Sequence, residues 1–167
     1  MGKVTDLGRT QRAIDFKSHS SIWLAVGQTS AWPDEDNPPD EEVDISTIDE
    51  VVGYKLLTES WLVKEDADGV LEVGGTFYSK VADVNANTEK PVHLYLKFEI
   101  EPDELTIATY RQIGIFVDLV PSEGNASKSS LLAAEVSSVG RLVYTSNELP
   151  VTRQTETRHV FEVVLPM

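Results

Sequence analysis

The stretch PVHLYLKFEIEP (residues 91–102) decides the fold class, because apolar side chains occupy every second position along most of it. In an extended strand successive side chains point to opposite faces, so this pattern predicts one buried face and one solvated face. The predicted buried face consists of Val92, Leu94, Leu96, Phe98 and Ile100. The predicted solvated face consists of His93, Tyr95, Lys97, Glu99 and Glu101.

Further strands are predicted on both sides of this stretch. SIWLAVG (21–27) and RQIGIFVDLVP (111–121) are rich in apolar residues, which is typical of buried strands. VLEVGGTFYSKV (70–81) and HVFEVVLPM (159–167) alternate in polarity, and GRLVYTSNELPVTR (140–153) predicts a strand, a turn and a second strand.

Helical patterns are scarce. RTQRAIDFK (9–17) favours one short amphipathic helix. The segment from residue 45 to residue 65 is mixed, because Ile45, Ile48, Val51 and Val52 keep helical spacing whereas the later part favours strands. At 167 residues the chain has the size of one domain that can bury its own core. We therefore predict a single mainly β domain over residues 1–167, with an antiparallel β-sandwich-like core, an N-terminal helical arm (1–20) and a long acidic Pro-rich loop (28–44).

Composition excludes several classes of protein. Hydrophobic residues make up 41% and charged residues 25%, which is globular composition, and no apolar run is long enough to span a bilayer. Cysteine is absent, so a disulfide framework and thiolate metal sites are excluded. The net charge of −14 disfavours nucleic acid and anionic membranes as partners and favours proteins with basic or apolar faces.

No catalytic or cofactor signature is present. The chain contains no nucleophile elbow, phosphate-binding loop or dinucleotide motif, and its three histidines (His19, His93 and His159) are too far apart in sequence for a zinc motif. Asp34, Asp36, Asp40 and Glu42 suggest calcium, but Pro38-Pro39 stand where an EF-hand needs its turn glycine. We therefore predict a protein that is not an enzyme and that has no metal, cofactor or small-molecule substrate.

The stretch AVGQTSAWPDEDNPPDEEVD (25–44) combines a Trp-Pro pair with acids and further prolines. A solvated linker has no use for an indole, whose burial is worth roughly 2–3 kcal/mol. Prolines stiffen the chain and lower the entropy lost on docking. We therefore predict an ordered arm that is anchored by Trp32. The anchor packs either on the core of its own chain or on a neighbouring subunit.

The same region carries a resemblance to a known family. IWLAVGQTSAWPDEDNPP (22–39) resembles a pattern in the baseplate wedge proteins of contractile-tailed bacteriophages, in which an apolar strand, a Gly-x-Thr/Ser turn and Trp-Pro precede acids and a double proline. GRLVYTSNELPVTRQTETRHVFEVVLPM (140–167) resembles the closing segment of that family, including Pro-Val-x-Arg, and YRQIGIFVDLVP (110–121) is loosely similar. The chain is much shorter than the T-even wedge subunit that it resembles.

The resemblance implies a structural subunit of a contractile tail, most simply a baseplate wedge component that joins neighbouring tail proteins in many copies per ring. Such a subunit is made in the host cytoplasm and ends in the virion. The interface candidates are Trp32, Pro33, Asp34, Asp36, Pro38, Pro39 and Arg153. Two alternatives stay open: a neck, collar or adaptor subunit, and a carbohydrate- or ligand-binding module in which Trp23, Trp32 and Trp61 form a stacking platform.

Overall fold

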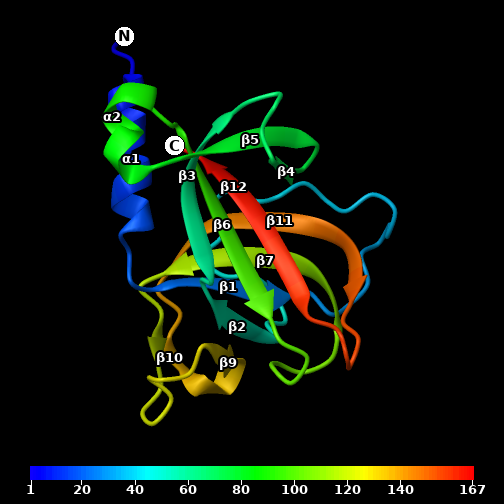
Figure 1. Ribbon diagram of the computed structural model, residues 1–167. Coiled ribbons are helices and arrows are strands. Elements are labelled where there is room, and N and C mark those ends of the chain that lie inside the picture. The colour runs from blue at the N-terminus through cyan, green and yellow to red at the C-terminus, as the bar shows by residue number, and fades with distance from the viewer. The chain divides into compact units, whose positions relative to one another are not determined.

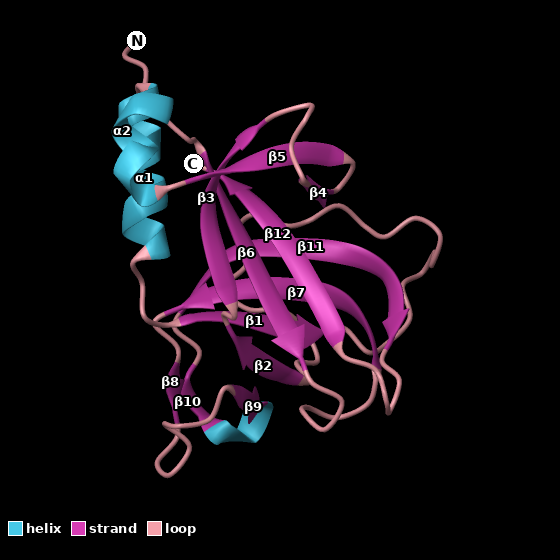
Figure 2. Cartoon of the chain, in the orientation of Figure 1, coloured by secondary structure: helices cyan, strands magenta, loops and turns pink.

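The computed structural model describes residues 1–167 and confirms a mainly β, antiparallel protein with a short N-terminal helix (Figures 1 and 2). Contacts group the residues into two compact units. Unit 1 comprises Met1–Ser20, Thr58–Phe98 and Phe161–Met167, and unit 2 comprises Ser21–Leu57 and Glu99–Val160. The single-domain organisation stays a prediction. No helix is both long enough and apolar enough to cross a membrane.

Unit 1 begins with helix α1 (Asp6–Lys17). The helix starts three residues before the segment that the sequence predicts, because the Thr5 hydroxyl accepts a hydrogen bond from the Gly8 amide and caps the first turn. Inside the helix, the buried Thr10 hydroxyl donates to the Pro91 carbonyl at 2.9 Å, which fastens the helix to the segment just before residue 93, where a strand of unit 1 begins.

The sheet of unit 1 has the strand order β12-β6-β3-β5-β4. Its members are β3 (Glu59–Glu65), β4 (Leu71–Val73), β5 (Thr76–Val81), β6 (His93–Ile100) and β12 (His159–Pro166). A 3-10 turn η1 (Asp83–Asn85) and the short helix α2 (Ala86–Glu89) connect β5 to β6. Strand β6 is the stretch that decides the fold class, and its alternation is confirmed by the complete burial of Leu94, Leu96, Phe98 and Ile100.

The other face of β6 differs from the prediction at one position. Tyr95 is buried rather than solvated, and it packs with Val63 and Tyr78 in a second small core. Its hydroxyl donates to the Glu162 carboxylate at 2.6 Å, which satisfies the polar end of a buried ring. Both faces of the sheet around β6 and β3 therefore bury side chains.

The sheet of unit 2 has the strand order β11-β7-β1-β2-β9. Its members are β1 (Ile22–Gly27), β2 (Gly53–Leu56), β7 (Thr109–Val117), β9 (Ser130–Leu132) and β11 (Arg141–Thr152). A separate ribbon pairs β8 (Val120–Pro121) with β10 (Val136–Ser138), and a 3-10 turn η2 (Ala133–Glu135) precedes β10. The predicted buried strands β1 and β7 are confirmed: β1 is buried throughout, and β7 is buried from its second residue onward.

The structure resolves one mixed pattern and overturns one predicted turn. Residues 45–52, which keep helical spacing within the mixed segment, form no helix: Ile48 enters the core beside Trp23 and Phe116, and the carbonyl of Asp49 accepts from the Gln28 amide instead of closing a helical turn. The segment 140–153 contains no turn, because β11 is one continuous strand whose register shifts, between Leu142 and Tyr144 and between Asn147 and Val151, absorb the extra residues.

Candidate functional site

The acidic arm, residues 28–44, leaves the end of β1 as an ordered loop that contains neither helix nor strand (Figure 1, the blue-to-cyan loop). It starts at Gly27, where any side chain would meet the Asp49 carbonyl, since a Cβ atom there would lie only 2.3 Å from that oxygen. The start of the arm and the segment that follows it are thus in direct backbone contact.

Trp32 anchors the arm on its own chain. Its ring is half-buried, and the indole Nε1 donates to the carbonyl of Glu148 on β11 at 3.0 Å. The indole thus contacts its own chain, and its exposed part leaves packing on a neighbouring subunit as a prediction. The ring lies at a strand edge rather than in the hydrophobic core.

An ion pair holds the middle of the arm. Arg111 on β7 is only 8% exposed, and its guanidinium donates to both carboxylate oxygens of Glu35, with the Nη2–Oε1 distance at 2.6 Å. The same guanidinium donates through Nη1 to the Thr29 carbonyl at 2.7 Å. A bidentate contact of this kind fixes direction as well as distance. One arginine therefore fixes two points of the arm.

Hydrogen bonds also hold the part of the arm near Pro39 and the part near Ser30. Asn147 on β11 donates from Nδ2 to the Pro39 carbonyl at 2.9 Å, and its backbone amide donates to the Glu41 carboxylate at 3.1 Å. Near the start, the Glu50 carboxylate accepts from the amide of Ser30 at 2.7 Å and from its hydroxyl at 2.6 Å. The arm is thus tied to the scaffold along its whole length.

The sequence predicts the arm but not the residues that hold it. Arg111 lies 76 positions from its partner Glu35. Asn147 lies 108 positions from Pro39, and Glu148 lies 116 positions from Trp32. Of these residues, Arg111 alone stands out in the sequence, because it is the one charged side chain within the apolar stretch TYRQIGIFV. A charge at a buried strand position requires a partner.

The predicted interface candidates within the arm lie mostly at its surface. Pro33, Asp34, Asp36 and Pro39 are exposed, whereas Pro38 is half-buried. Asp34 organises the local turn by accepting from the Asp36 amide at 3.1 Å and from the Asn37 side chain at 2.8 Å. Apart from Glu35, the carboxylates of the arm form no ion pair. Their charges are available to a partner.

Arg153, the remaining candidate, is 2% exposed. Its guanidinium donates to the carbonyls of Glu104 at 2.7 Å, Leu105 at 3.3 Å and Glu101 at 3.0 Å. These bonds hold the loop before β7 in shape, including Leu105 in a left-handed conformation with a φ of 57°. Arg153 therefore organises its own chain, and its side chain offers nothing to the surface.

Two hollows flank the arm. A pocket of about 450 Å³ lies against Trp32 and is lined by Asp40, Glu42, Asp44 and Asp49, among others. A groove of about 270 Å³ lies between residues 41–45 and β11. Both hollows consist of arm residues on one side and residues of the sheet on the other, so their shapes depend on the docked arm.

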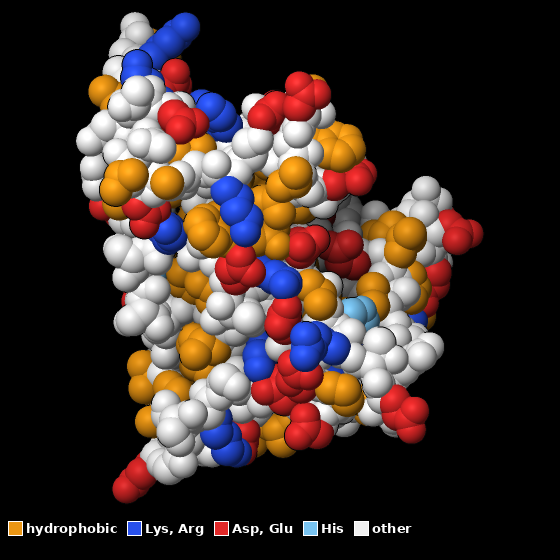
Figure 3. All heavy atoms as spheres, in the orientation of Figure 1, with side chains coloured by type: hydrophobic (Ala, Val, Ile, Leu, Met, Phe, Trp, Pro, Cys, Tyr) orange, Lys and Arg blue, Asp and Glu red, His pale blue; other side chains and the backbone are white.

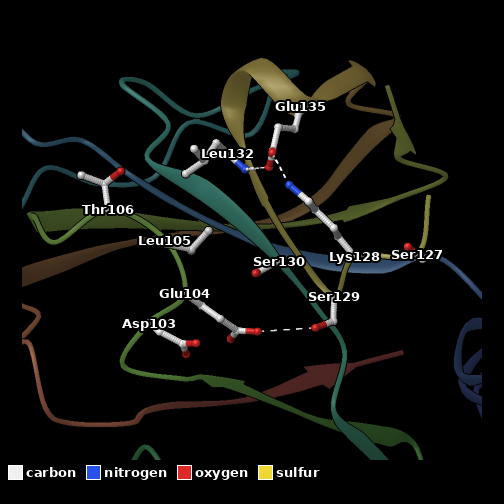
Figure 4. Close-up of a pocket in the computed structure, with 10 residues that line it drawn as sticks. All are labelled: Asp103, Glu104, Leu105, Thr106, Ser127, Lys128, Ser129, Ser130, Leu132 and Glu135. Atoms are coloured by element: carbon white, nitrogen blue, oxygen red, sulfur yellow. Dashed lines mark hydrogen bonds and ion pairs between the residues drawn. The ribbon is translucent and has the colours of Figure 1, made fainter. Parts of the chain in front are cut away.

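A larger pocket of about 670 Å³ lies beside edge strand β9 (Figure 4). Hydroxyls of Thr106, Ser127, Ser129 and Ser130 line it, with the Lys128–Glu135 ion pair at one end. Its opposite wall includes Glu104, whose carboxylate pairs with the buried ammonium of Lys55 at 2.6 Å. No aromatic ring lines this pocket, so it lacks the stacking surface that favours sugars.

The three indoles form no common platform. Trp23 is 4% exposed in the core of unit 2, beside Tyr54 and Phe116. Trp32 is engaged by β11 as described. Trp61 belongs to unit 1, where the Lys80 ammonium lies 4.1 Å from the ring centroid. A binding module built on stacking by all three rings is excluded by the burial of Trp23.

The carboxylates that dock the arm have lowered pKa values. The hydrogen bond from Arg111 lowers the pKa of Glu35, the hydrogen bond from the Ser30 hydroxyl lowers that of Glu50, and the Asn37 side chain lowers that of Asp34. A carboxyl group whose pKa is lower in the folded state stabilises that state above its ordinary pKa, and the contribution is lost as pH falls through the lowered value.

We therefore expect the arm to detach in acid, below the ordinary glutamate pKa of 4.5. The indole N–H resonance of Trp32 should shift toward its solvent-exposed position as pH falls from 7 to 3, while that of buried Trp23 stays unchanged. Two-dimensional NMR measures both signals, and Trp32→Phe assigns the first. In Glu35→Gln, which lacks the charged partner, the arm should already be loosened at pH 7. A Trp32 signal that does not move in either protein would contradict the ion-pair account.

Ordered, charged loops on a β scaffold are typical of surfaces that contact other macromolecules. Residues 1–167 match the family described as baseplate wedge 3 tail fiber network component, and the chain belongs to that family. It is also 31% identical over 163 residues to Virion protein 3 of Enterococcus phage phiEF24C, covering 93% of this chain and 90% of that protein.

The resemblance to baseplate and tail structural proteins of phages is thus confirmed, and the chain is a structural component of the virion. On the face shown in Figure 3, Lys and Arg side chains are interspersed with Asp and Glu and gather into no continuous basic patch.

Proposed function

We propose that the chain joins neighbouring proteins of the phage baseplate, and that the acidic arm is the surface through which it does so. The observation that carries the proposal is the way the arm is held: an Arg111–Glu35 ion pair, the Trp32 anchor and the Asn147 contacts fix its backbone, yet most of its carboxylates stay unpaired. A pre-shaped loop loses little entropy when it binds.

Charge supports a basic partner. No Lys or Arg occurs between Lys17 and Lys55, so the arm and its flanks present negative charge alone. Complementary charge across an interface raises the association rate and fixes the choice of partner. Membership of a family of baseplate wedge and tail fiber network components supports association with other tail proteins. We propose that the chain works there in many copies, without nucleic acid, membrane or substrate and without catalytic activity.

Carbodiimide cross-linking of purified phage particles tests the proposal, because this reagent joins carboxylates to lysines in direct contact. We expect adducts between arm residues 34–44 and lysines of other tail proteins, identified by mass spectrometry. Particles that lack the chain, or that contain it with an arm joined to nothing, would contradict the proposal.

Charge neutralisation gives a second, quantitative test. Asp40→Asn with Glu42→Gln should weaken association with the tail proteins, whereas Glu72→Gln with Glu123→Gln removes the same charge from exposed positions outside the arm and should not. Raising the salt above roughly 0.15 M, where the screening length is about 8 Å, should lower the affinity of the wild-type protein for the tail proteins until it approaches that of the arm variant. Sedimentation velocity of the mixed proteins measures this. Association that salt leaves unchanged would mean that apolar contacts dominate.

A further inference from the structure

Strand β11 is an edge strand, and it is the longest strand of the chain at 12 residues. It pairs with β7 on one side, through residues such as Ser146 opposite Ile113 and Tyr144 opposite Ile115. The other side has no strand partner. Exposed edges of this length are templates for the addition of a strand from another chain.

The direction of the free backbone groups follows from one hydrogen bond. The amide of Asn147 points away from β7, because it donates to the Glu41 carboxylate of the arm at 3.1 Å. In antiparallel pairs the backbone groups alternate in direction along the strand, and the register of residues 144–147 against β7 is continuous. The amide of Thr145, two residues earlier, therefore also points to the open side, where no protein group is bonded to it.

A groove runs along this open side. Its floor and walls are Leu142, Val143, Tyr144 and Thr145 of β11 and, from the arm, Glu41, Glu42, Val43 and Ile45. Two of the apolar side chains are strongly exposed: Val43 at 99% and Val143 at 44%. The arm thus supplies the second wall that a bare strand edge lacks, with apolar contacts inside and carboxylates at the rim.

We propose that an extended segment of another tail protein, apolar with a flanking Lys or Arg, adds as a strand to β11 in this groove. The proposal rests on the proposed function and names the place and chemistry of one of its contacts. The carboxylate of Glu42 forms no ion pair and that of Glu41 accepts only from a neutral amide, so a cation at the rim gains two negative partners. Backbone pairing to β11 supplies affinity, and the apolar pockets select alternate side chains.

A second copy of the same chain is the poorer occupant. Pairing two β11 edges would bring two acidic arms together, and like charges across an interface repel each other. The expected occupant is therefore a segment of a different, basic protein.

Hydrogen exchange in purified particles tests the inference directly. The segment 141–146 should exchange at least tenfold more slowly in the particle than in the isolated chain. The variant Thr145→Pro removes the outward amide and the hydroxyl that donates to the Ile113 carbonyl, but no backbone bond to β7, as proline can at an edge strand, and should reduce incorporation into particles at least tenfold. Thr145→Val is the matched control, since it also removes the hydroxyl but keeps the amide, and should be incorporated normally.

A second pair of variants tests the same edge in case the proline variant does not fold. Val143→Lys places a cation at the open edge and should block incorporation, whereas Val160→Lys, at the nearly equal exposure of 43%, should not. If the chain is present in particles but residues 141–146 exchange as in the free chain, the inference is wrong and the proposed function stands. If the chain is absent from particles, the proposed function fails. Slow exchange in the isolated chain that depends on its concentration would mean that a second copy is the occupant, which overturns the inference.

Discussion

Arg153→Ala is expected to lower the free energy of unfolding by about 3–5 kcal/mol, because three backbone carbonyls lose the donor that satisfies them. The side chain is fully enclosed and donates to the carbonyls of Glu101, Glu104 and Leu105. Each buried carbonyl that loses its donor costs about 1–3 kcal/mol. Urea denaturation followed by circular dichroism measures the difference.

Arg158→Ala is the matched control. Arg158 lies five residues later, is exposed, and pairs with Glu99 and Glu101 at the surface. Exposed ion pairs contribute about 0–1 kcal/mol, so this variant should unfold almost like the wild type. Equal losses in the two variants would show that the loop before β7 does not depend on the bonds of Arg153.

Trp32→Ala is expected to free the arm and to abolish most incorporation into particles. Losing half-buried indole area and the hydrogen bond to Glu148 should cost about 2 kcal/mol of arm docking. That cost corresponds to roughly a thirtyfold increase in arm opening, given tenfold for each 1.4 kcal/mol. Hydrogen exchange of residues 29–44 measures the opening, and phage complementation measures incorporation.

Trp32→Phe separates the two contributions. It keeps a ring at the strand edge but has no N–H donor for Glu148, so it should open the arm by less than the alanine variant does. The global unfolding midpoint should change little in either protein, because the arm can detach while the sheet stays folded. If both variants exchange and assemble like the wild type, residues 28–44 act as a solvated linker.

The sequence predicts the parts of the fold that alternate in polarity and lie in the interior. Strand β6 is an example, because Leu94, Leu96 and Phe98 obey the period of the pleat. Tyr95 does not follow the prediction of a solvated face on β6. Its side chain is buried by Tyr78 and by strands that are distant in sequence. No local pattern contains that information.

Contacts between segments that are distant in sequence explain what the sequence leaves open around Ile48 and in the arm. The spacing around Ile48 imitates a helix, but the carbonyl of Asp49 bonds to Gln28 and its amide to the Gln112 side chain, so tertiary partners replace helical ones. For the arm, the indole of Trp32 and the prolines predict an ordered segment. No sequence pattern indicates that Asn147, at a bulged position of β11, contacts this segment. Side chains that fasten a loop from a distant strand are set by register, which sequence alone does not reveal.

The interleaving of the two units along the chain has a consequence for heredity. Unit 1 draws on the beginning, the middle and the end of the sequence, and two of its four boundaries fall inside strands, in β6 after Phe98 and in β12 after Val160. A genetic crossover anywhere between residues 20 and 161 would therefore give unit 1 segments from two parents that never evolved to pack together. Recombination between phages should therefore exchange the gene as a whole. Relatives should then align from end to end, as the phage phiEF24C protein does over 93% of this chain.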